Sequence, residues 1–380
     1  MRWETVRAAL DAALNMCTDR VSVEFNGGEP LLEPDRLRRA VRFLERHRGR
    51  REISLLLYTN GTLLTCELLD FLVEHSFQLR LSSDGASAAQ DLRAPGTFAV
   101  LDRLLDRLRE SYPTYFREKV YVGMTLCASA IPHLAQSVRY IVGKGVAEID
   151  LEPRLTHEPD WDHAKKDELE AQVDEVLEIS LDHWRRTGQV PLKFLSGAPL
   201  RNADALVGDS LCPSVEGHTF LVDPDGRAWA CPLLAPSLCT IPPLAADASR
   251  VMALGEISDP ALVGRLKRLP ARARALRMFT HKRAKHSAYG ACDECRFLPD
   301  CYVCPTSISR IPRNDDPDRV PDFLCAYNQV MLAARERFDE MTGSELSAAW
   351  YENVRAALGR LETALRNSVE RHERTNQAAV

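Results

Sequence analysis

Eleven cysteines are spread along this 380-residue chain, and four of them crowd into the segment ACDECRFLPDCYVCP, residues 291–305. They are Cys292, Cys295, Cys301 and Cys304, in the spacing C-x2-C-x5-C-x2-C. Thiolates at such short intervals suit zinc or an iron–sulfur cluster, whereas in an oxidising compartment they would form disulfides. The compartment therefore decides which chemistry applies.

The start of the chain, MRWETVRAALDAALNMC, is an amphipathic helical pattern without the basic head, apolar run and cleavage site of a signal peptide. No apolar run approaches the length of about eighteen residues that spans a membrane. We therefore expect a cytoplasmic protein, in which clustered cysteines bind metal more often than they form disulfides. The net charge of −5 gives no electrostatic reason to expect nucleic acid or a membrane surface as a partner.

Three further cysteines extend the pattern. Cys212 is followed by Gly226 and then by Cys231, at the end of a predicted hairpin over FLVDPDGRAWAC, and Cys325 follows the crowded segment. A zinc site closes with four ligands and would leave three of the seven thiols over. Iron–sulfur clusters divide seven thiols into one closed cluster and one with an open iron. We expect iron–sulfur clusters, with a zinc-stabilised module and inert buried thiols as alternatives.

The elements that must position such sites alternate in the first half of the chain. Short runs rich in Val, Ile and Leu predict parallel strands buried on both faces, at 20–25, 52–59, 77–84, 119–126 and 147–153. Helical patterns lie between them, at about 34–48, 65–75, 97–111 and 132–143. Because a closed barrel of eight units takes roughly 250 residues, we predict an α/β fold with a partial, open βα barrel or an open sheet.

Unusual loops follow the first three predicted strands, namely NGGEP at 26–30, TNG at 59–61 and SSDG at 82–85. Ligands of such folds bind at the carboxyl ends of the strands. The paired glycines expose backbone N–H groups, and Glu29 offers a carboxylate to an amine. The three loops together predict a site for an amino-acid-like ligand, although each alone could be an ordinary turn.

The segments FNGGEPLL, YTNGTLLT, LSSDG and DLRAPGTFAVL resemble the core of the radical S-adenosylmethionine (SAM) enzymes, in the branch with a C-terminal SPASM domain. The resemblance spans roughly residues 1–155 and 205–330. It implies that the GGEP segment holds the methionine part of SAM and that later strand ends line the ribose and adenine. The SAM-binding residues it implies are Gly27, Gly28, Glu29, Pro30, Ser82, Asp84 and Thr125.

The cysteines match the SPASM pattern with one departure, since two residues instead of three separate Cys301 from Cys304. The resemblance implies two auxiliary [4Fe-4S] clusters. The distal one would be held by Cys292, Cys295, Cys301 and Cys325, and the one nearer the barrel by Cys212, Cys231 and Cys304. The second set leaves a coordination position open, for which Cys239 is a candidate; otherwise Cys239, like Cys66 and Cys127, is an ordinary thiol. Pro232 stands where sulfatase-maturing members have Asp, which argues against that activity.

The cluster that cleaves SAM in this family is held by C-x3-C-x2-C upstream of GGEP, where this sequence has Cys17 alone. We expect either that Met1 is an internal methionine, with the triad encoded just upstream, or that the triad is lost. The chain as written should bind SAM weakly or not at all and should not cleave it.

The resemblance implies a maturase that modifies a peptide or protein substrate and takes electrons from a donor such as flavodoxin or ferredoxin. The alternative is a non-catalytic scaffold or electron-transfer protein with two clusters. We expect a partial barrel at 1–155, a bridging helical segment at 156–205, a SPASM domain at 206–330 and C-terminal helices at 331–380. The basic run HKRAKH, residues 281–286, is expected to be a solvated turn, with docking of an acidic leader peptide as the alternative.

Overall fold

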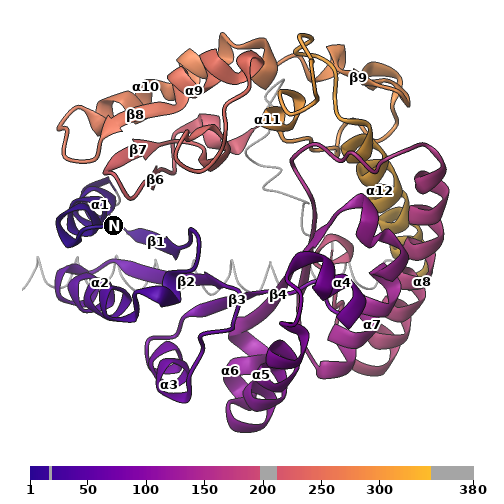
Figure 1. Ribbon diagram of the computed structural model, residues 1–380, viewed down its shortest axis with the longest axis horizontal. Helices are drawn as coiled ribbons and strands as arrows, with labels where there is room; N and C mark the ends of the chain where they lie inside the picture. Colours follow the sequence, from indigo (N-terminus) through magenta and orange to yellow (C-terminus); the bar gives the residue numbers. More distant parts are fainter. Residues whose placement is uncertain (17–18, 197–211, 344–380) are drawn as a thin grey trace, which may run out of the picture. The chain divides into compact units, whose positions relative to one another are not determined.

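A computed structural model describes residues 1–16, 19–196 and 212–343 (Figure 1). Two compact units make up the chain, Met1–Ala334 and Arg335–Val380. The last described helix, α12 (Asp322–Thr342), begins in the first unit and ends in the second. Cys17 and the second expected C-terminal helix lie outside the described residues.

A parallel sheet of five strands forms the first half of the chain, in the order β1-β2-β3-β4-β5. Each strand pairs with its sequence neighbour, as successive βα units require. This confirms the predicted α/β architecture and is consistent with a partial barrel. The strands are β1 (Arg20–Phe25), β2 (Glu52–Thr59), β3 (Gln78–Ser82), β4 (Val120–Leu126) and β5 (Ile149–Pro153).

Helices connect these strands and cover one face of the sheet (Figure 1). The predicted helices are α2 (Pro34–His47), α3 (Cys66–Glu74), α5 (Phe98–Ser111) and α7 (Leu134–Lys144). Two shorter ones, α4 (Ser87–Arg93) and α6 (Pro113–Lys119), were not predicted. Local sequence marks the ends: Thr65 caps α3 by accepting the Leu68 N–H, and α7 stops at Gly145 in the left-handed region.

The strands are buried mainly on the face that the helices cover. Leu57, Leu79, Val122 and Ile149 on that face have no exposed surface. Along β1 and β3 burial alternates, and the opposite face, called the inner face here, carries polar side chains such as Arg80. The expectation of strands buried on both faces therefore holds only in part, because the inner face is largely half-buried and period-two alternation places charged residues there.

The second half of the first unit begins after the long helix α8 (Ala164–Thr187). The predicted hairpin is present as β6 (Leu221–Val222) and β7 (Arg227–Trp229), turning at Gly226 with φ +97°. A third strand that was not predicted, β8 (Ala253–Glu256), pairs with β7. The remaining elements are α9 (Ala246–Met252), α10 (Leu262–Arg274), β9 (His286–Ser287), β10 (Gly290–Ala291) and α11 (Pro305–Ile308).

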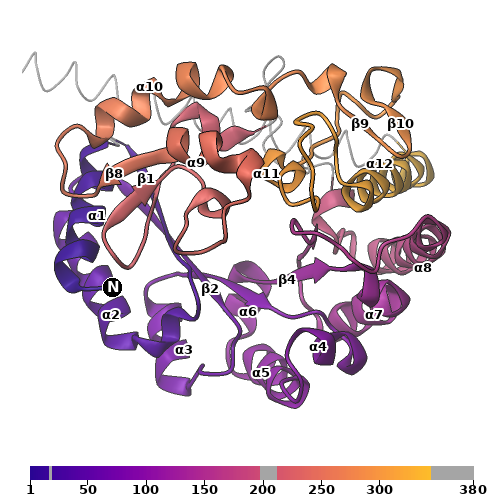
Figure 2. The ribbon, with the colours of Figure 1, turned by 45° about the horizontal axis from the view of Figure 1, so that its top comes forward.

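Helix α1 (Trp3–Met16) packs against both halves (Figures 1 and 2). Its residues Leu10 and Leu14 belong to a core with β1 and α2. Its residues Ala8 and Ala12 pack against a second core, which contains Cys212 and Cys231. The amphipathic pattern at the start of the chain therefore has an apolar partner on two sides. Within the described residues, no helix is long and apolar enough to cross a membrane.

Candidate functional site

The GGEP loop directly follows β1 and is open on its glycine side. Gly27 has φ +133°, which glycine adopts readily, and a Cβ on Gly27 or Gly28 would meet no atom within 4 Å. Both glycines are exposed, whereas Glu29 and Pro30 are half-buried. The Gly27 N–H donates to Asn26 Oδ1 at 2.7 Å, and binding of a ligand by the backbone of this loop stays a prediction.

Glu29 has partners within the protein. Its Oε1 accepts hydrogen bonds from the Thr59 hydroxyl at 2.8 Å and from the Leu31 N–H at 3.1 Å. Its Oε2 accepts the Asn60 N–H at 2.9 Å. The carboxylate thus fastens the loop after β1 to the TNG loop after β2. A ligand ammonium would have to share oxygens that already accept three hydrogen bonds.

Asp84 joins the ends of the next two strands in a similar way. It is 8% exposed, and its Oδ1 accepts hydrogen bonds from Arg93 at 2.8 Å and from the Thr125 N–H at 3.0 Å. Ser82 and Thr125 are half-buried at the ends of β3 and β4, on the inner face. The structure therefore places all seven residues implied in SAM binding along one edge of the sheet, and their binding of SAM stays a prediction.

An ion cluster that was not predicted lies on the inner face. Arg80 on β3 forms ion pairs with Asp150 at 3.1 Å and with Glu152 at 2.8 Å, both on β5. Its guanidinium also lies over the ring of Tyr58 on β2, 5.3 Å from the centroid. Burial would lower the pKa of Arg80, but the charges of Glu152 and Asp150 raise it above its ordinary value. The cluster is thus a set of charges that stabilise one another away from bulk water.

A cavity connects this cluster to one of the predicted metal ligands. It lies between the end of β5 and the loop that precedes α11 and is narrow, with a volume of about 40 Å³. Its lining includes Asp150, Glu152, Lys193, Tyr302 and Cys304. The two carboxyl groups could accept a proton from a group held in the cavity or donate one to it. Alternating charges in IDLEP, residues 149–153, were the sequence signal for this wall.

Three of the seven predicted ligands come together as buried thiols. Cys212, Cys231 and Cys304 are 5–6% exposed. Burial raises the pKa of Cys212 to about 11, and the neighbouring charge of Cys304 adds to the shift. The same two causes, with Cys212 as a further neighbour, raise the pKa of Cys231. These residues are called the three-cysteine group.

The other four predicted ligands form a second set. Burial raises the pKa of Cys292 to about 11 and that of Cys301 to about 12, and the charges of Cys325 and Cys295 add to both shifts. Burial and the charge of Cys295 also raise the pKa of Cys325. We call Cys292, Cys295, Cys301 and Cys325 the four-cysteine group. The two groups adjoin, because only Tyr302 and Val303 separate Cys301 from Cys304.

The remaining thiols differ from these. Every cysteine in the described ranges is free of disulfides, and among those residues no set of three His, Cys, Asp or Glu side chains is arranged to hold a single metal ion. Cys66 is exposed, Cys127 is buried beside Ser129, and Cys239 lies at a separate hollow lined by Pro236 and Arg250. One group of buried thiols and one of half-buried thiols fit a larger metal cofactor chemically, since coordination to iron stabilises thiolates that burial otherwise disfavours.

Comparisons with known proteins agree with this architecture. No family model matches the chain. An uncharacterised protein of Methanocaldococcus jannaschii, MJ0907, is 24% identical over 244 residues, which cover 63% of this chain and 78% of that protein.

Solved structures share the fold. The structure of anSMEcpe with bound AdoMet has a TM-score of 0.68 and 17% identity, covering 92% of this chain and 89% of that one. Native anSMEcpe with bound AdoMet and Kp18Cys peptide has a TM-score of 0.66 and 16% identity, covering 90% of each chain. Streptococcus suis SuiB bound to precursor peptide SuiA has a TM-score of 0.52 and 13% identity, covering 86% and 69%.

Proposed function

We propose that this chain is an iron–sulfur protein of the radical SAM/SPASM type, suited to act on a peptide or protein side chain but unable to cleave SAM without the C-x3-C-x2-C triad that its sequence lacks. The observation that carries the proposal is the sorting of seven cysteines into a three-cysteine and a four-cysteine group. The groups adjoin at Cys301 and Cys304, in a fold shared with anSMEcpe with bound AdoMet.

The four-cysteine group would hold a closed [4Fe-4S] cluster, and the three-cysteine group one with an open iron. Bound clusters would supply electron transfer. The number of cysteines fits clusters better than zinc, because a tetrahedral zinc site takes four ligands and would leave three of the seven thiols over.

A SAM-like ligand would lie along the edge that carries the GGEP loop, Ser82 and Thr125. The exposed backbone at Gly28 suits its carboxylate, whereas the Gly27 N–H already donates to Asn26 Oδ1 at 2.7 Å. In this arrangement Glu29 contributes first by holding two loops in register and only then as a partner for the ligand ammonium. Asp84 likewise supports the edge by fastening the Thr125 backbone.

A peptide side chain would enter the cavity between β5 and Cys304. Two of the similar structures hold peptides, Kp18Cys in anSMEcpe and SuiA in SuiB. In this chain the cavity wall carries Asp150 and Glu152, which Arg80 holds in place. These carboxylates are the candidates for accepting a proton from the substrate. Pro232, which stands where sulfatase-maturing members have Asp, has no ionisable side chain.

Anaerobic reconstitution tests the proposal. The purified protein is supplied with iron and sulfide, and bound iron, sulfide and zinc are measured beside the visible spectrum. Two [4Fe-4S] clusters correspond to about eight irons per chain and a brown protein. Stoichiometric zinc without visible absorption would contradict the proposal and favour the zinc-stabilised module.

A second candidate is an electron carrier or peptide-binding scaffold with the same clusters. The observation in its favour is that Glu29 and Asp84 are both engaged by the chain's own donors. Equilibrium dialysis with labelled AdoMet separates the candidates. Saturable binding, which should be weak without the C-x3-C-x2-C triad, supports the first candidate. Binding that stays absent even in a reconstituted chain extended at its start by that triad supports the second.

A further inference from the structure

We propose that Lys282 is the counter-charge of the four-cysteine group and raises the reduction potential of the cluster held there. This inference rests on the proposed function, because it requires that cluster. It concerns the basic run 281–286, which was expected to be a solvated turn. That expectation is wrong for two of its side chains, since Lys282 is half-buried and Lys285 is 2% exposed.

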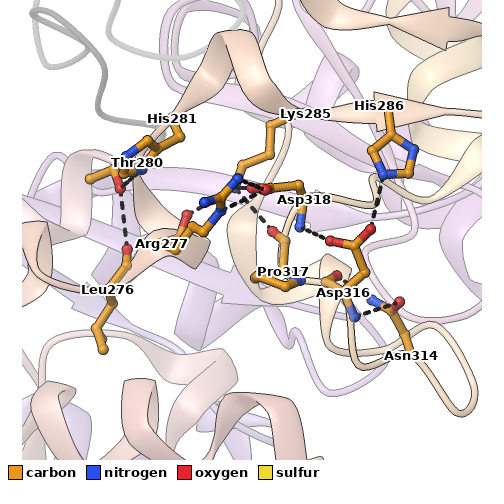
Figure 3. Close-up of polar contacts among 10 residues, drawn as sticks. All are labelled: Leu276, Arg277, Thr280, His281, Lys285, His286, Asn314, Asp316, Pro317 and Asp318. Atoms are coloured by element: carbon orange, nitrogen blue, oxygen red, sulfur yellow. Dashed lines mark hydrogen bonds and ion pairs between the residues drawn. The ribbon is translucent and has the colours of Figure 1, made fainter.

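Lys285 anchors the run in the protein interior (Figure 3). Its Nζ donates hydrogen bonds to Asp318 Oδ1 at 2.8 Å, to the Arg277 carbonyl at 2.9 Å and to the Pro317 carbonyl at 3.0 Å. Arg277 also pairs with Asp318, from Nε to Oδ2 at 2.6 Å. With its three donors used, this buried ammonium fixes the position of its own backbone.

A backbone hydrogen bond links Lys285 to Cys292, the first cysteine of the group. The carbonyl oxygen of Lys285 accepts the N–H of Cys292 at 2.9 Å. On the other side, the N–H of Lys285 donates to the carbonyl of Lys282 at 3.3 Å, closing a short turn. The backbone of Lys282 is thereby held at a set place relative to Cys292.

The Lys282 side chain turns toward the second segment of the group. Its Nζ donates to the Pro299 carbonyl at 3.3 Å, two residues before Cys301. Its positive charge lowers the pKa of both Cys301 and Cys292, against the larger effect of their burial. The ammonium therefore lies at the segment that leads to Cys301, on a side chain that is half-buried.

A fixed positive charge at this place favours an additional electron. Reduction adds one negative charge to the cluster, and the attraction is stronger where water is partly excluded. In the three-cysteine group the backbone N–H groups of Ser214 and Leu233, among others, lower the pKa of Cys212 and Cys231. Lys285 also lowers the pKa of Cys292 and Lys166 that of Cys325, but the Lys285 ammonium is already paired with Asp318. Because Lys282 contacts Pro299, within the segment of the four-cysteine group, it should act mainly on that cluster.

The experiment is a redox titration of the reconstituted full chain, followed by electron paramagnetic resonance. Lys282→Gln should make reduction of one cluster about tenfold less favourable, which is a fall of about 59 mV for one electron, and leave the other unchanged. Arg283→Gln is the matched control, because Arg283 carries the same charge one residue away but is exposed. Lys282→Arg keeps the charge and should restore the wild-type value.

The outcomes are distinct. Equal potentials in wild type and Lys282→Gln, at equal iron content, overturn the inference and leave the proposed function standing. Shifts of the same size in Lys282→Gln and Arg283→Gln also overturn it, because they would report net charge instead of position. A wild-type chain that takes up no iron–sulfur cluster overturns both proposals.

Discussion

A side chain at residue 123 would collide with the guanidinium of Arg80. A Cβ built on Gly123 would clash with Nε of Arg80 and stand 3.0 Å from Nη2. Gly123 lies on β4, between the strand of Arg80 and β5, where Asp150 and Glu152 accept the ion pairs. The missing side chain is what lets the arginine cross an intervening strand to reach both carboxylates.

Gly123→Ala should therefore displace Arg80 and lower the free energy of unfolding by about 1–3 kcal/mol, the usual range for overpacking. Urea denaturation measures this. The control is Gly143→Ala in α7, where a Cβ would meet no atom within 4 Å. A helical Gly→Ala change at an open site should stabilise by about 0.5–1 kcal/mol. Equal changes in the free energy of unfolding for the two substitutions would contradict the inference that Arg80 needs the space at Gly123 to reach Asp150 and Glu152.

Glu29→Gln should destabilise the fold as well as weaken AdoMet binding. The amide replaces one oxygen with a donor, which then opposes either the Asn60 N–H or the donors at Oε1. Losing a hydrogen bond to a charged group costs about 1.5–3 kcal/mol. Urea denaturation and equilibrium dialysis are run on the same samples. Glu33→Gln, at an exposed surface pair with Arg36, should change little. Unchanged stability in Glu29→Gln would show that the carboxylate serves the ligand alone.

Single thiol substitutions should remove clusters in blocks. Cys295→Ser and Cys231→Ser alter different groups, so each should lower bound iron by about four per chain. Cys239→Ser should leave bound iron unchanged, because Cys239 lies at a hollow apart from both groups. Iron analysis after anaerobic reconstitution gives the count. A loss of iron in Cys239→Ser would instead make Cys239 the fourth ligand of the three-cysteine group.

Acid should weaken the anchor beneath the four-cysteine group. Burial alone would raise the pKa of Asp318, but hydrogen bonds from Arg277 and Lys285 lower it below its ordinary value. A carboxyl with a lowered folded pKa stabilises the protein above the unfolded value of about 3.9 and loses that contribution as pH falls through the folded value. Denaturation series from pH 7 to pH 3 should show a smaller loss in Asp318→Asn than in wild type. Asp315→Asn, at an exposed position, should keep the wild-type slope.

The strands and the sheet edge that carries the GGEP, TNG and SSDG loops could be predicted because their signals are local. The run RVSVEF is strand β1 residue for residue, and the loops after β1, β2 and β3 meet at one edge because the strands are parallel. The division of the thiols followed from a family resemblance, since spacing alone does not say which cysteines meet in space.

The ion cluster and the anchor could not be predicted in the same way. Arg80 meets Asp150 across two strand pairings, and Lys285 meets Asp318 across 33 residues. Such partners depend on register and loop path, which short sequence windows do not contain. The available signal was the polar or charged residue at every second position of QLRLS and IDLEP, which indicates that one face of these strands is polar.

Helix α1 couples the unfolding of the two halves of the first unit. Because its 14 residues supply side chains to the core beneath β1 and to the core around Cys212, neither half can melt without exposing apolar surface of the other. The two halves should therefore unfold as one cooperative unit. Metal binding at the thiols would then slow amide hydrogen exchange in β1 and β2, although these strands contain no cysteine. The effect would reach them through the shared helix α1.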